Sequence, residues 1–401
     1  MTASYRSSHA AGRVADVFLA FLKLGLTSFG GPVAHLGYFR QEFVERRKWL
    51  DETSFADVIA LCQFLPGPAS SQVGIAIGLS RAGYAGALAA WTAFTLPSAL
   101  ALILFAYAIS TSGVPLDAGW LHGLKVAAVA VVALAILGMA RTLTPDRQRA
   151  ALAIIAMAIA FAVPSSLGQV AAIVFGGLAG ALLLRNGAPS TGEAHLPLTI
   201  RRSSGAFCLA VFAILLVGLP LAASLSDLET VHLFDKFFRA GALVFGGGHV
   251  VLPLLQSEVV APGWVSNDAF LAGYGAAQAV PGPLFTFAAY LGTVIGGAGT
   301  AALCLVAIFL PSFLLVIGTL PFWQELRRRP IAQALLRGVN ASVVGLLLAA
   351  FYDPVWTSGI LSKGDFALAA ADFALLYLWK APPWLVVVLS AVAGQALATL
   401  A

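Results

Sequence analysis

Two Pro-Gly-Pro triplets interrupt apolar stretches of the chain, at Pro66-Gly67-Pro68 and at Pro281-Gly282-Pro283. Proline inside a helix removes a backbone donor and clashes with the preceding turn, so each triplet predicts that one helix ends and another begins. Pro68 and Pro283 are expected at the first position of the new helix. Within a membrane, its free N–H groups, from about Ala69 to Ser71 and from Leu284 to Thr286, would present a partial positive charge to an anion. A kink that serves only packing is the alternative. The polar side chains beside the breaks are predicted donors to this anion: Gln63, Ser70, Ser71, Gln278 and Thr286.

Basic side chains within apolar stretches form a second group. Lys23 and Arg239 each precede a Phe-Gly-Gly at the same spacing, while Lys125 lies in a later apolar segment. A basic group inside a bilayer is costly, so it normally faces a cavity or a partner. We therefore predict that these three cations help to bind an anion. Snorkelling of each side chain to the headgroups is the alternative.

Three carboxylates could carry a coupling proton if burial raised their pKa. Glu42 and Glu258 follow the two Phe-Gly-Gly motifs at the same spacing, and Asp57 opens the stretch that carries the first Pro-Gly-Pro. A solvated loop charge, a helix N-cap or an ion pair with Arg40 or Arg46 would explain them equally well. The choice stays open at this point.

Paired glycines predict close packing or chain reversal at Gly30, Gly31, Gly246 and Gly247. They are too short for a nucleotide-binding fingerprint. The sequence also contains no Ser/His/Asp arrangement and no metal-ligand spacing, and Cys62, Cys208 and Cys304 are scattered in apolar stretches. The chain is therefore predicted to be no enzyme and to need no cofactor or metal.

The composition is that of a polytopic membrane protein. Of 401 residues, 60% are hydrophobic and 10% are charged, against about 45–50% apolar and about 25% charged in soluble domains. Mean hydropathy is +0.90. The net charge of +5 then points to membrane orientation and an anionic substrate rather than to nucleic acid. The lipid bilayer is a predicted partner.

About 20 apolar residues span a bilayer as a helix. The fold class is therefore all-α, and thirteen apolar segments are expected. Those at 149–163 and 166–184 read as a tight hairpin around Pro164-Ser165. The segments are 16–38, 57–79, 84–112, 119–140, 149–163, 166–184, 206–225, 234–256, 269–294, 298–321, 331–352, 365–379 and 382–400.

The chain repeats itself, with the same motifs in the same order in both halves. The number of residues between the two copies of a motif decreases by one from each motif to the next. Alignment of the two halves therefore requires only small gaps. The motifs are Phe29-Gly30-Gly31, which recurs as Phe245-Gly246-Gly247, Pro66-Gly67-Pro68, which recurs as Pro281-Gly282-Pro283, and Leu96-Pro97-Ser98, which recurs as Leu310-Pro311-Ser312.

We predict a first repeat in residues 1–200, and a linker helix with a second repeat in residues 201–401. Because six segments and one connector precede it, the second repeat would begin on the opposite side of the membrane. The two repeats would then be inverted, as in many secondary transporters.

Lys and Arg counts predict the orientation. If all thirteen segments span, thirteen basic residues lie on the N-terminal side and six on the other, four of them at positions 40–48. If the Gly-Gly and Pro-Gly-Pro segments re-enter on one face, the count becomes seventeen to two. The second arrangement is favoured. Both place the N-terminus in the cytoplasm and the C-terminus outside, in the periplasm for an inner-membrane protein.

The chain resembles the chromate ion transporter family in its long, two-domain bacterial form. The resemblance runs from about Phe18 to the C-terminus. It implies export of chromate across the cytoplasmic membrane, with proton coupling commonly proposed and sulfate treated as an analogue. The stretches that carry it are Lys23-Leu24-Gly25, Phe29-Gly30-Gly31-Pro32, Gln63 to Pro68, Phe245 to His249 and Gln278 to Pro283.

The sequence thus predicts a secondary transporter of a tetrahedral oxyanion, most specifically chromate. A dianion with four acceptor oxygens needs donors and positive potential around it. Transport of sulfate or another inorganic anion on the same scaffold is one alternative, and a polytopic enzyme acting on lipid-linked substrates is a weaker one. The sequence leaves open whether two copies form a homodimer.

Overall fold

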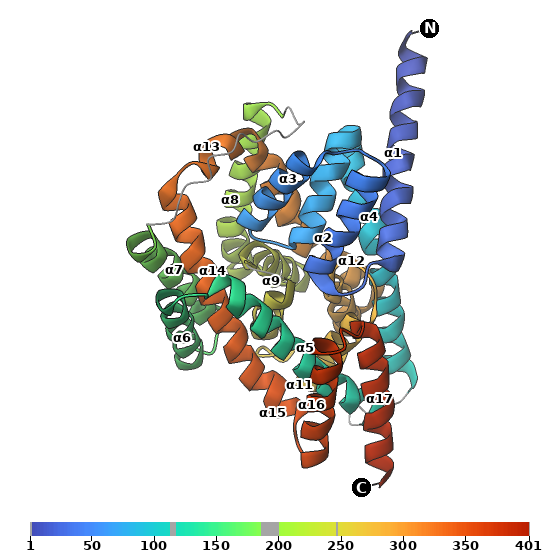
Figure 1. The fold of residues 1–401 in the computed structure, drawn as a ribbon, viewed down its shortest axis with the longest axis vertical. Helices are drawn as coiled ribbons and strands as arrows, with labels where there is room; N and C mark the ends of the chain where they lie inside the picture. The colour runs from blue at the N-terminus through green and yellow to red at the C-terminus, as the bar shows by residue number, and fades with distance from the viewer. Residues whose placement is uncertain (1, 113–117, 186–199, 246–247, 401) are drawn as a thin grey trace.

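The computed structural model describes residues 2–112, 118–185, 200–245 and 248–400, and within these ranges it contains helices and no strand. Helix α1 begins at one end of the long axis, and α17 ends at the other (Figure 1). The first repeat contains α1 (Thr2–Thr27), α2 (Gly31–Arg40), the π-helix η1 (Gln41–Arg46), α3 (Glu52–Phe64), α4 (Ala69–Ser112), α5 (Gly119–Leu143), α6 (Arg147–Ala162) and α7 (Ser166–Leu183).

The second repeat follows the same order after the connecting helix α8 (Arg202–Ser224). Only 6% of the apolar window of α8 is buried, against 67% in α14, so α8 lies on the outside of the bundle. The remaining elements are α9 (Glu229–Leu243), η2 (Gly248–Val250), α10 (Val251–Val259), α11 (Asn267–Ala279), η3 (Leu284–Thr286), α12 (Phe287–Thr319), η4 (Leu320–Phe322), α13 (Trp323–Arg327), α14 (Pro330–Ala350), η5 (Phe351–Trp356), α15 (Thr357–Gly359), α16 (Lys363–Tyr377) and α17 (Pro383–Leu400).

Within the described ranges, five helical stretches are long and apolar enough to cross a membrane. They are 69–111, 119–143, 202–224, 284–327 and 330–359. The thirteen predicted segments do not map onto them one for one. The segment 16–38 is divided between α1 and α2, and 57–79 between α3 and the start of α4.

The two longest stretches each contain a sharp turn at matched positions. Ala82 and Gly83 leave helical φ/ψ in α4, and Gly296 and Gly297 do so in α12. The helices on either side of the first turn then pack back to back. A Cβ placed on Gly78 would lie 2.3 Å from the carbonyl oxygen of Gly86, a spacing that only small residues allow. Each stretch is therefore a helical hairpin.

The hairpin predicted around Pro164-Ser165 is present, since α6 ends at Ala162 and α7 packs against it from Ser166. At its start, Asp146 accepts the N–H of Arg149. This bond, together with the Arg149 guanidinium, lowers the pKa of the Asp146 carboxyl. Helices α16 and α17 form the corresponding pair in the second repeat.

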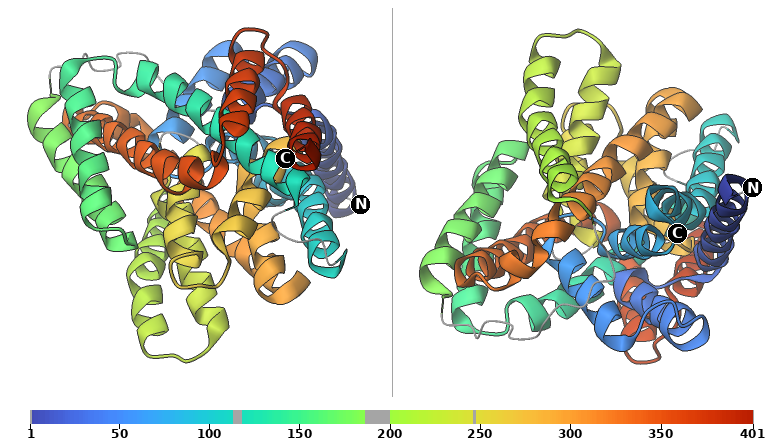
Figure 2. Two further views of the ribbon diagram at one scale, coloured as in Figure 1. Left: turned by 90° about the horizontal axis from the view of Figure 1, so that it is seen from below. Right: turned by 90° about the horizontal axis from the view of Figure 1, so that it is seen from above.

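These terminal hairpins are exchanged between the repeats. Helix α7 packs along α14 of the second repeat, and α17 packs along α5 of the first (Figure 2). Small residues permit both contacts. A Cβ on Gly338 would lie 1.9 Å from the carbonyl oxygen of Gly176, and a Cβ on Gly123 would lie 2.2 Å from that of Ser390. The two repeats are thus interlocked rather than side by side.

Candidate functional site

Both Pro-Gly-Pro triplets break the helix where the proline spacing predicts. Helix α3 ends at Phe64 and α4 begins at Ala69, and α11 ends at Ala279 before η3 begins at Leu284. The central glycines have positive φ, +126° at Gly67 and +102° at Gly282. Residues with a Cβ rarely adopt this conformation.

Two details of the predicted half-helix starts need correction. Pro68 and Pro283 each lie just before the first helical residue rather than at it. The N–H of Thr286, which was expected to be free, bonds to the carbonyl of Pro283 over 3.0 Å, because the new helix starts with a tight 3-10 turn. The hydroxyl of Thr286 donates to the same carbonyl.

Each break is held by the opposite repeat. The N–H of Gly67 donates to the carbonyl of Val244 over 2.6 Å, and the N–H of Gly282 donates to the carbonyl of Ser28 over 2.9 Å. Ser28 directly precedes the first Phe-Gly-Gly, and Val244 directly precedes the second. The bonds are therefore equivalent and reciprocal, and they bring both predicted break sites to the meeting point of the repeats.

Matched serines complete the reciprocal arrangement. A Cβ on Gly67 would lie 2.9 Å from Oγ of Ser312, and one on Gly282 would lie 2.8 Å from Oγ of Ser98. Ser98 and Ser312 end the two Leu-Pro-Ser motifs. Each break therefore packs against a hydroxyl from the other repeat.

Buried polar atoms without a hydrogen-bond partner are numerous on these elements. An unsatisfied buried donor or acceptor costs about 1–3 kcal/mol, so such atoms are natural ligands for a small polar solute. The amide nitrogen of Gln72 donates to the carbonyl of Pro66 over 2.6 Å, and its amide oxygen has no hydrogen-bond partner among the described residues. Among the described residues, the atoms concerned include Ser28 Oγ, Ser71 Oγ, Gln72 Oε1, Thr95 Oγ1 and Ser312 Oγ.

Sequence reasoning placed some of these groups correctly beside the breaks and missed others. Ser70 and Ser71 are buried, Gln278 is half-buried, and Gln63 is exposed. Ser28 and Ser312 were missed, since they approach the breaks only through the opposite repeat. Gly30 and Gly31 have positive φ and reverse the chain between α1 and α2. Gly246 and Gly247 lie outside the described residues.

The predicted cations and carboxylates pair with one another at matched positions. Nζ of Lys23 lies 3.4 Å from Oε2 of Glu42, and Nη1 of Arg239 lies 3.2 Å from Oε1 of Glu258. Each pair joins the helix before a Gly-Gly to the helix after it. The cation and the carboxylate that the sequence assigned to separate roles therefore occupy one site in each repeat.

Further charges surround these pairs. Arg46 and Arg47 also contact Glu42, the latter over 2.7 Å, so three cations favour the ionised form of one carboxylate. The ion pair with Arg46 was among the alternatives drawn from the sequence. Arg47 was not, although its place beside Arg46 in a basic loop is visible there.

The second pair has different neighbours. Asp235 holds Arg239 through two hydrogen bonds of 3.0 and 2.8 Å. Lys236 contacts Glu258 over 3.1 Å. Sequence reasoning missed Asp235 and Lys236, although Asp235 stands one turn before Arg239 on the same helix.

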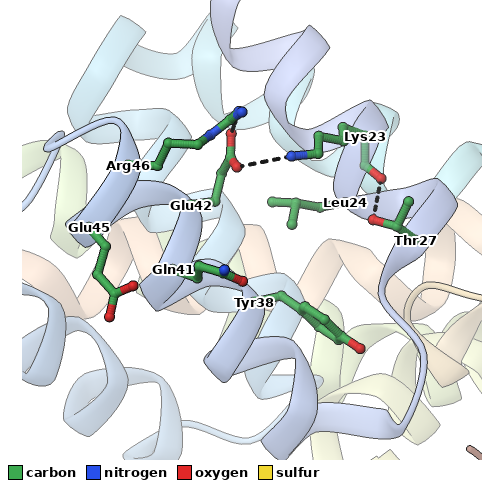
Figure 3. Close-up of a pocket in the computed structure, with 8 residues that line it drawn as sticks. All are labelled: Lys23, Leu24, Thr27, Tyr38, Gln41, Glu42, Glu45 and Arg46. Atoms are coloured by element: carbon green, nitrogen blue, oxygen red, sulfur yellow. Dashed lines mark hydrogen bonds and ion pairs between the residues drawn. The ribbon is translucent and has the colours of Figure 1, made fainter.

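A cavity of about 540 Å³ opens beside the first pair. Figure 3 shows Lys23 of α1 and Arg46 of η1 converging on Glu42, with Tyr38 further along the cavity. The matched position in the second repeat holds a pocket of about 10 Å³, lined by Val170 as well as by Arg239 and Glu258. The same site is thus open in one repeat and closed in the other.

Helix α7 closes the second site. Nε2 of the buried Gln169 donates to the carbonyl of Pro253 over 2.8 Å, and the hydroxyl of Ser257 donates to Gln169 over 3.3 Å. The residue matched to Pro253 is Gly37, where a Cβ would meet nothing within 4 Å. The first site has no such cover at this position.

Gln169→Ala is expected to loosen this closure by about 1 kcal/mol, the usual contribution of one hydrogen bond. A cysteine at Leu254, which lines the closed pocket, should then react several-fold faster with a small thiol reagent than in the parent chain. Ser257→Ala, which leaves the Gln169 bond to Pro253 intact, is the matched control. An unchanged rate in Gln169→Ala would mean that apolar packing alone holds the pocket shut.

Two further ion pairs join the repeats. Nζ of the buried Lys125 lies 2.6 Å from Oδ1 of Asp268, at the start of α11. Oδ1 of Asp57, on α3, lies 2.9 Å from Nη1 of Arg327, on α13. Lys125 and Asp57 are therefore engaged in ion pairs between the repeats.

The architecture is that of an integral membrane protein, with two related helical repeats interlocked around paired helix breaks. The profile of the family described as "Chromate transporter" matches residues 15–181 and 231–395, once in each repeat. This chain belongs to that transporter family, which confirms the resemblance drawn from its motifs.

Curated relatives match over most of their length. The chain is 31% identical over 375 residues to the "Chromate transport protein" of Pseudomonas aeruginosa, covering 91% of this chain and 87% of that one. It is 28% identical over 392 residues to the "Probable chromate transport protein" of Synechococcus elongatus, covering 93% of both. It is 26% identical to the "Chromate transport protein" of Cupriavidus metallidurans, covering 84% of this chain and 81% of that one. No solved structure matches the chain.

Proposed function

We propose that this protein is a secondary active transporter that exports chromate across the cytoplasmic membrane, with proton coupling. The observation that carries the proposal is the reciprocal bonding of the Pro-Gly-Pro breaks, Gly67 to Val244 and Gly282 to Ser28. It gathers broken helices from two repeats at one place, which is where transporters with repeated halves bind their substrates. Membership of the chromate transporter family supports the substrate.

In this mechanism the oxyanion is held by the breaks and by hydroxyl and amide donors beside them. Ser71 and Ser312 each carry a buried hydroxyl without a partner among the described residues, and Gln278 is the proposed amide donor beside the second break. Hydrogen bonds to an anion are about twice as strong as those between neutral groups. Lys23, Lys125 and Arg239 supply positive potential, and Asp57 and Glu258 are the candidate proton carriers. Glu42, which the sequence also suggested for this role, does not suit it, because its three cationic neighbours favour the ionised carboxylate.

Alternating access would come from the two repeats, residues 1–200 and 201–401, moving against each other. The open cavity at Lys23 and the closed pocket at Arg239 support a state that is accessible from one side. Chain reversal at Gly30 and Gly31 and the turn at Ala82 and Gly83 support segments that enter and leave on the same face. The N-terminus would be cytoplasmic and the C-terminus periplasmic.

Sulfate and other tetrahedral oxyanions are the rival substrates, because hydrogen-bond donors recognise the shape and charge of an anion rather than its central atom. The proposal includes a homodimer, in which the partner is a second copy of this chain in the bilayer. No group of three or more His, Cys, Asp or Glu side chains in the described ranges is placed to hold a metal ion.

Uptake of labelled chromate and sulfate into inverted membrane vesicles tests the function. Chromate should accumulate with an imposed gradient, and a protonophore should reduce the accumulation. Lys23→Gln and Arg239→Gln should lower the initial rate at least tenfold at normal protein levels. Arg202→Gln removes an exposed arginine that pairs with Glu325 on the outside of the bundle, and it should transport normally. Absence of chromate accumulation under any gradient would overturn the proposal.

A further inference from the structure

One buried carboxylate stands apart from the ion pairs described above. Asp372, on α16, is 2% exposed, and its Oδ2 has no hydrogen-bond partner among the described residues. An ionised carboxylate without water or a cation beside it is costly, so these surroundings favour the neutral acid. The other buried acids of the described ranges each have a basic partner: Glu42, Asp57, Asp235, Glu258 and Asp365.

The charged and titratable groups around α16 are engaged with one another or exposed. Helix α16 packs against α5 and α17, and α17 contains no titratable side chain. Within the described ranges, none of the groups on α5, α16 and η5 forms an ion pair with Asp372. The paired groups are His122 with Asp365, Lys125 with Asp268 and Arg141 with Tyr377, and the exposed ones are Tyr352, Asp353, Lys363 and Lys380.

The polar group that faces the Asp372 carboxyl is the hydroxyl of Ser390, on α17. Oγ of Ser390 donates to the carbonyl oxygen of Gly123, on α5, over 2.9 Å. A carbonyl oxygen only accepts, and a hydroxyl has a single hydrogen, so that hydrogen is committed to Gly123. The carboxyl can then bond to Ser390 only as a donor. The arrangement is therefore the one that protonated Asp372 requires.

The bond from Ser390 to Gly123 joins the two repeats close to a helix break. The next residue on α5 is Leu124, whose carbonyl oxygen would lie 2.4 Å from a Cβ placed on Gly275. Gly275 belongs to α11, one turn before that helix ends at the second Pro-Gly-Pro. A shift of α5 at Gly123 therefore reaches the helix that leads into the break.

The first repeat makes the equivalent helix contact without these groups. A Cβ on Gly338 would lie 1.9 Å from the carbonyl oxygen of Gly176, as one on Gly123 would lie 2.2 Å from that of Ser390. Gly176 thus occupies the place of Ser390 and has no hydroxyl, and α6 contains no carboxylate. Because glycine alone suffices for this packing, Ser390 and Asp372 need a reason other than packing.

We propose that Asp372 is a proton-binding site, and that its proton holds α17 of the second repeat to α5 of the first through Ser390. When the proton leaves, the hydrogen of Ser390 turns to the carboxylate, and the carbonyl of Gly123 loses its bond from Ser390. Return of the proton restores both bonds. The inference rests on the proposed function for the use of this proton, and it adds to Asp57 and Glu258 a carrier that no cation holds.

Infrared difference spectroscopy of the purified full chain, recorded at stepped pH, tests the site itself. The parent chain should show the C=O band of one carboxylic acid that stays protonated where exposed carboxyls are ionised, and the band should disappear as the pH rises further. Asp372→Asn should lack this band. Ser390→Ala should keep it at a shifted frequency, because the acid has lost its acceptor. Glu325→Gln removes an exposed carboxylate that pairs with Arg202, and it should leave the band unchanged.

Uptake of chromate into inverted vesicles, driven by an imposed pH gradient, tests the use of the proton. Asp372→Asn should lower the initial rate about tenfold at normal protein levels, and Ser390→Ala several-fold. Glu325→Gln should stay within twofold of the parent. A carboxyl that serves only structure would leave the pH dependence of the rate unchanged in Asp372→Asn, and that result overturns the inference.

The two measurements separate the site from the proposed function. An infrared band that persists in Asp372→Asn overturns the proton site, whatever the vesicles transport. Should this variant not fold, an unshifted band in Ser390→Ala overturns it instead. A parent chain that shows the titrating band but moves no oxyanion under any gradient overturns the proposed function and leaves the proton site standing.

Discussion

Gly67→Val is expected to abolish transport. Residue 67 has a φ of +126°, which a β-branched residue adopts only under strain of about 1–3 kcal/mol. Its Cβ would also lie 2.5 Å from Nε2 of Gln72 and 2.9 Å from Oγ of Ser312. Relief of the first clash would cost the bond of Gln72 to Pro66. Relief of the backbone strain would move the residue 67 N–H away from Val244 and loosen the contact between the repeats. Uptake into vesicles, normalised to protein by immunoblot, measures the loss.

The matched glycine provides an internal check. Gly282→Val should abolish transport as well, because its Cβ would lie 2.8 Å from Oγ of Ser98 and its N–H bonds to Ser28. Gly138→Val is the control, since nothing lies within 4 Å of a Cβ there, and it should transport normally. Full activity in either break variant would show that the reciprocal bonds do not position the site.

Asp268→Asn is expected to destabilise the protein more than Lys125→Met does. The Lys125 side chain is 6% exposed and that of Asp268 is 52% exposed. Loss of the carboxylate leaves a buried ammonium without its partner, which costs about 3 kcal/mol. Loss of the ammonium leaves an acid that water can solvate. Thermal unfolding of the two variants, followed by fluorescence in the same detergent, should show the larger drop for Asp268→Asn.

The same pair distinguishes a structural from a substrate-binding role for Lys125. The double variant Lys125→Asp with Asp268→Lys restores the ion pair with its ends exchanged. If the lysine only joins α5 to α11, the double variant should recover stability and transport together. If Lys125 also faces the oxyanion, stability should return without transport. Equal instability of both single variants would contradict the burial argument.

Local chemistry predicted the helix breaks, because proline and glycine act within one turn of the chain. The sequence repeat also showed that Lys23 is equivalent to Arg239 and that Glu42 is equivalent to Glu258. It did not predict that Lys23 meets Glu42. That contact depends on the chain reversing at Gly30 and Gly31, and the angle of such a reversal is not encoded by residue spacing.

Contacts between the repeats could not be predicted from the sequence either. Ser28 and Ser312 approach the breaks only because the halves are interlocked. The repeated Phe-Gly-Gly and Leu-Pro-Ser motifs mark their neighbourhoods as equivalent in the two halves, but not as partners of the breaks. The thirteen apolar segments stay a prediction. The boundaries expected at 79/84 and at 294/298 fall at the turns inside α4 and α12. Hydropathy alone does not tell a hairpin arm that crosses the membrane from one that re-enters on the same face.

Exchange of the terminal hairpins has a consequence for biosynthesis. Helix α7 leaves the ribosome long before α14. The face of α7 that carries Gly176 and Gly180 is therefore in the bilayer before α14, on which it packs, has been synthesised. The delay is longer for α5, because its partner α17 is the last helix of the chain to be synthesised. The first repeat can therefore be inserted but not completed by itself. A gene cut between α7 and α8 should yield two inactive fragments that regain function only when both are synthesised in the same cell.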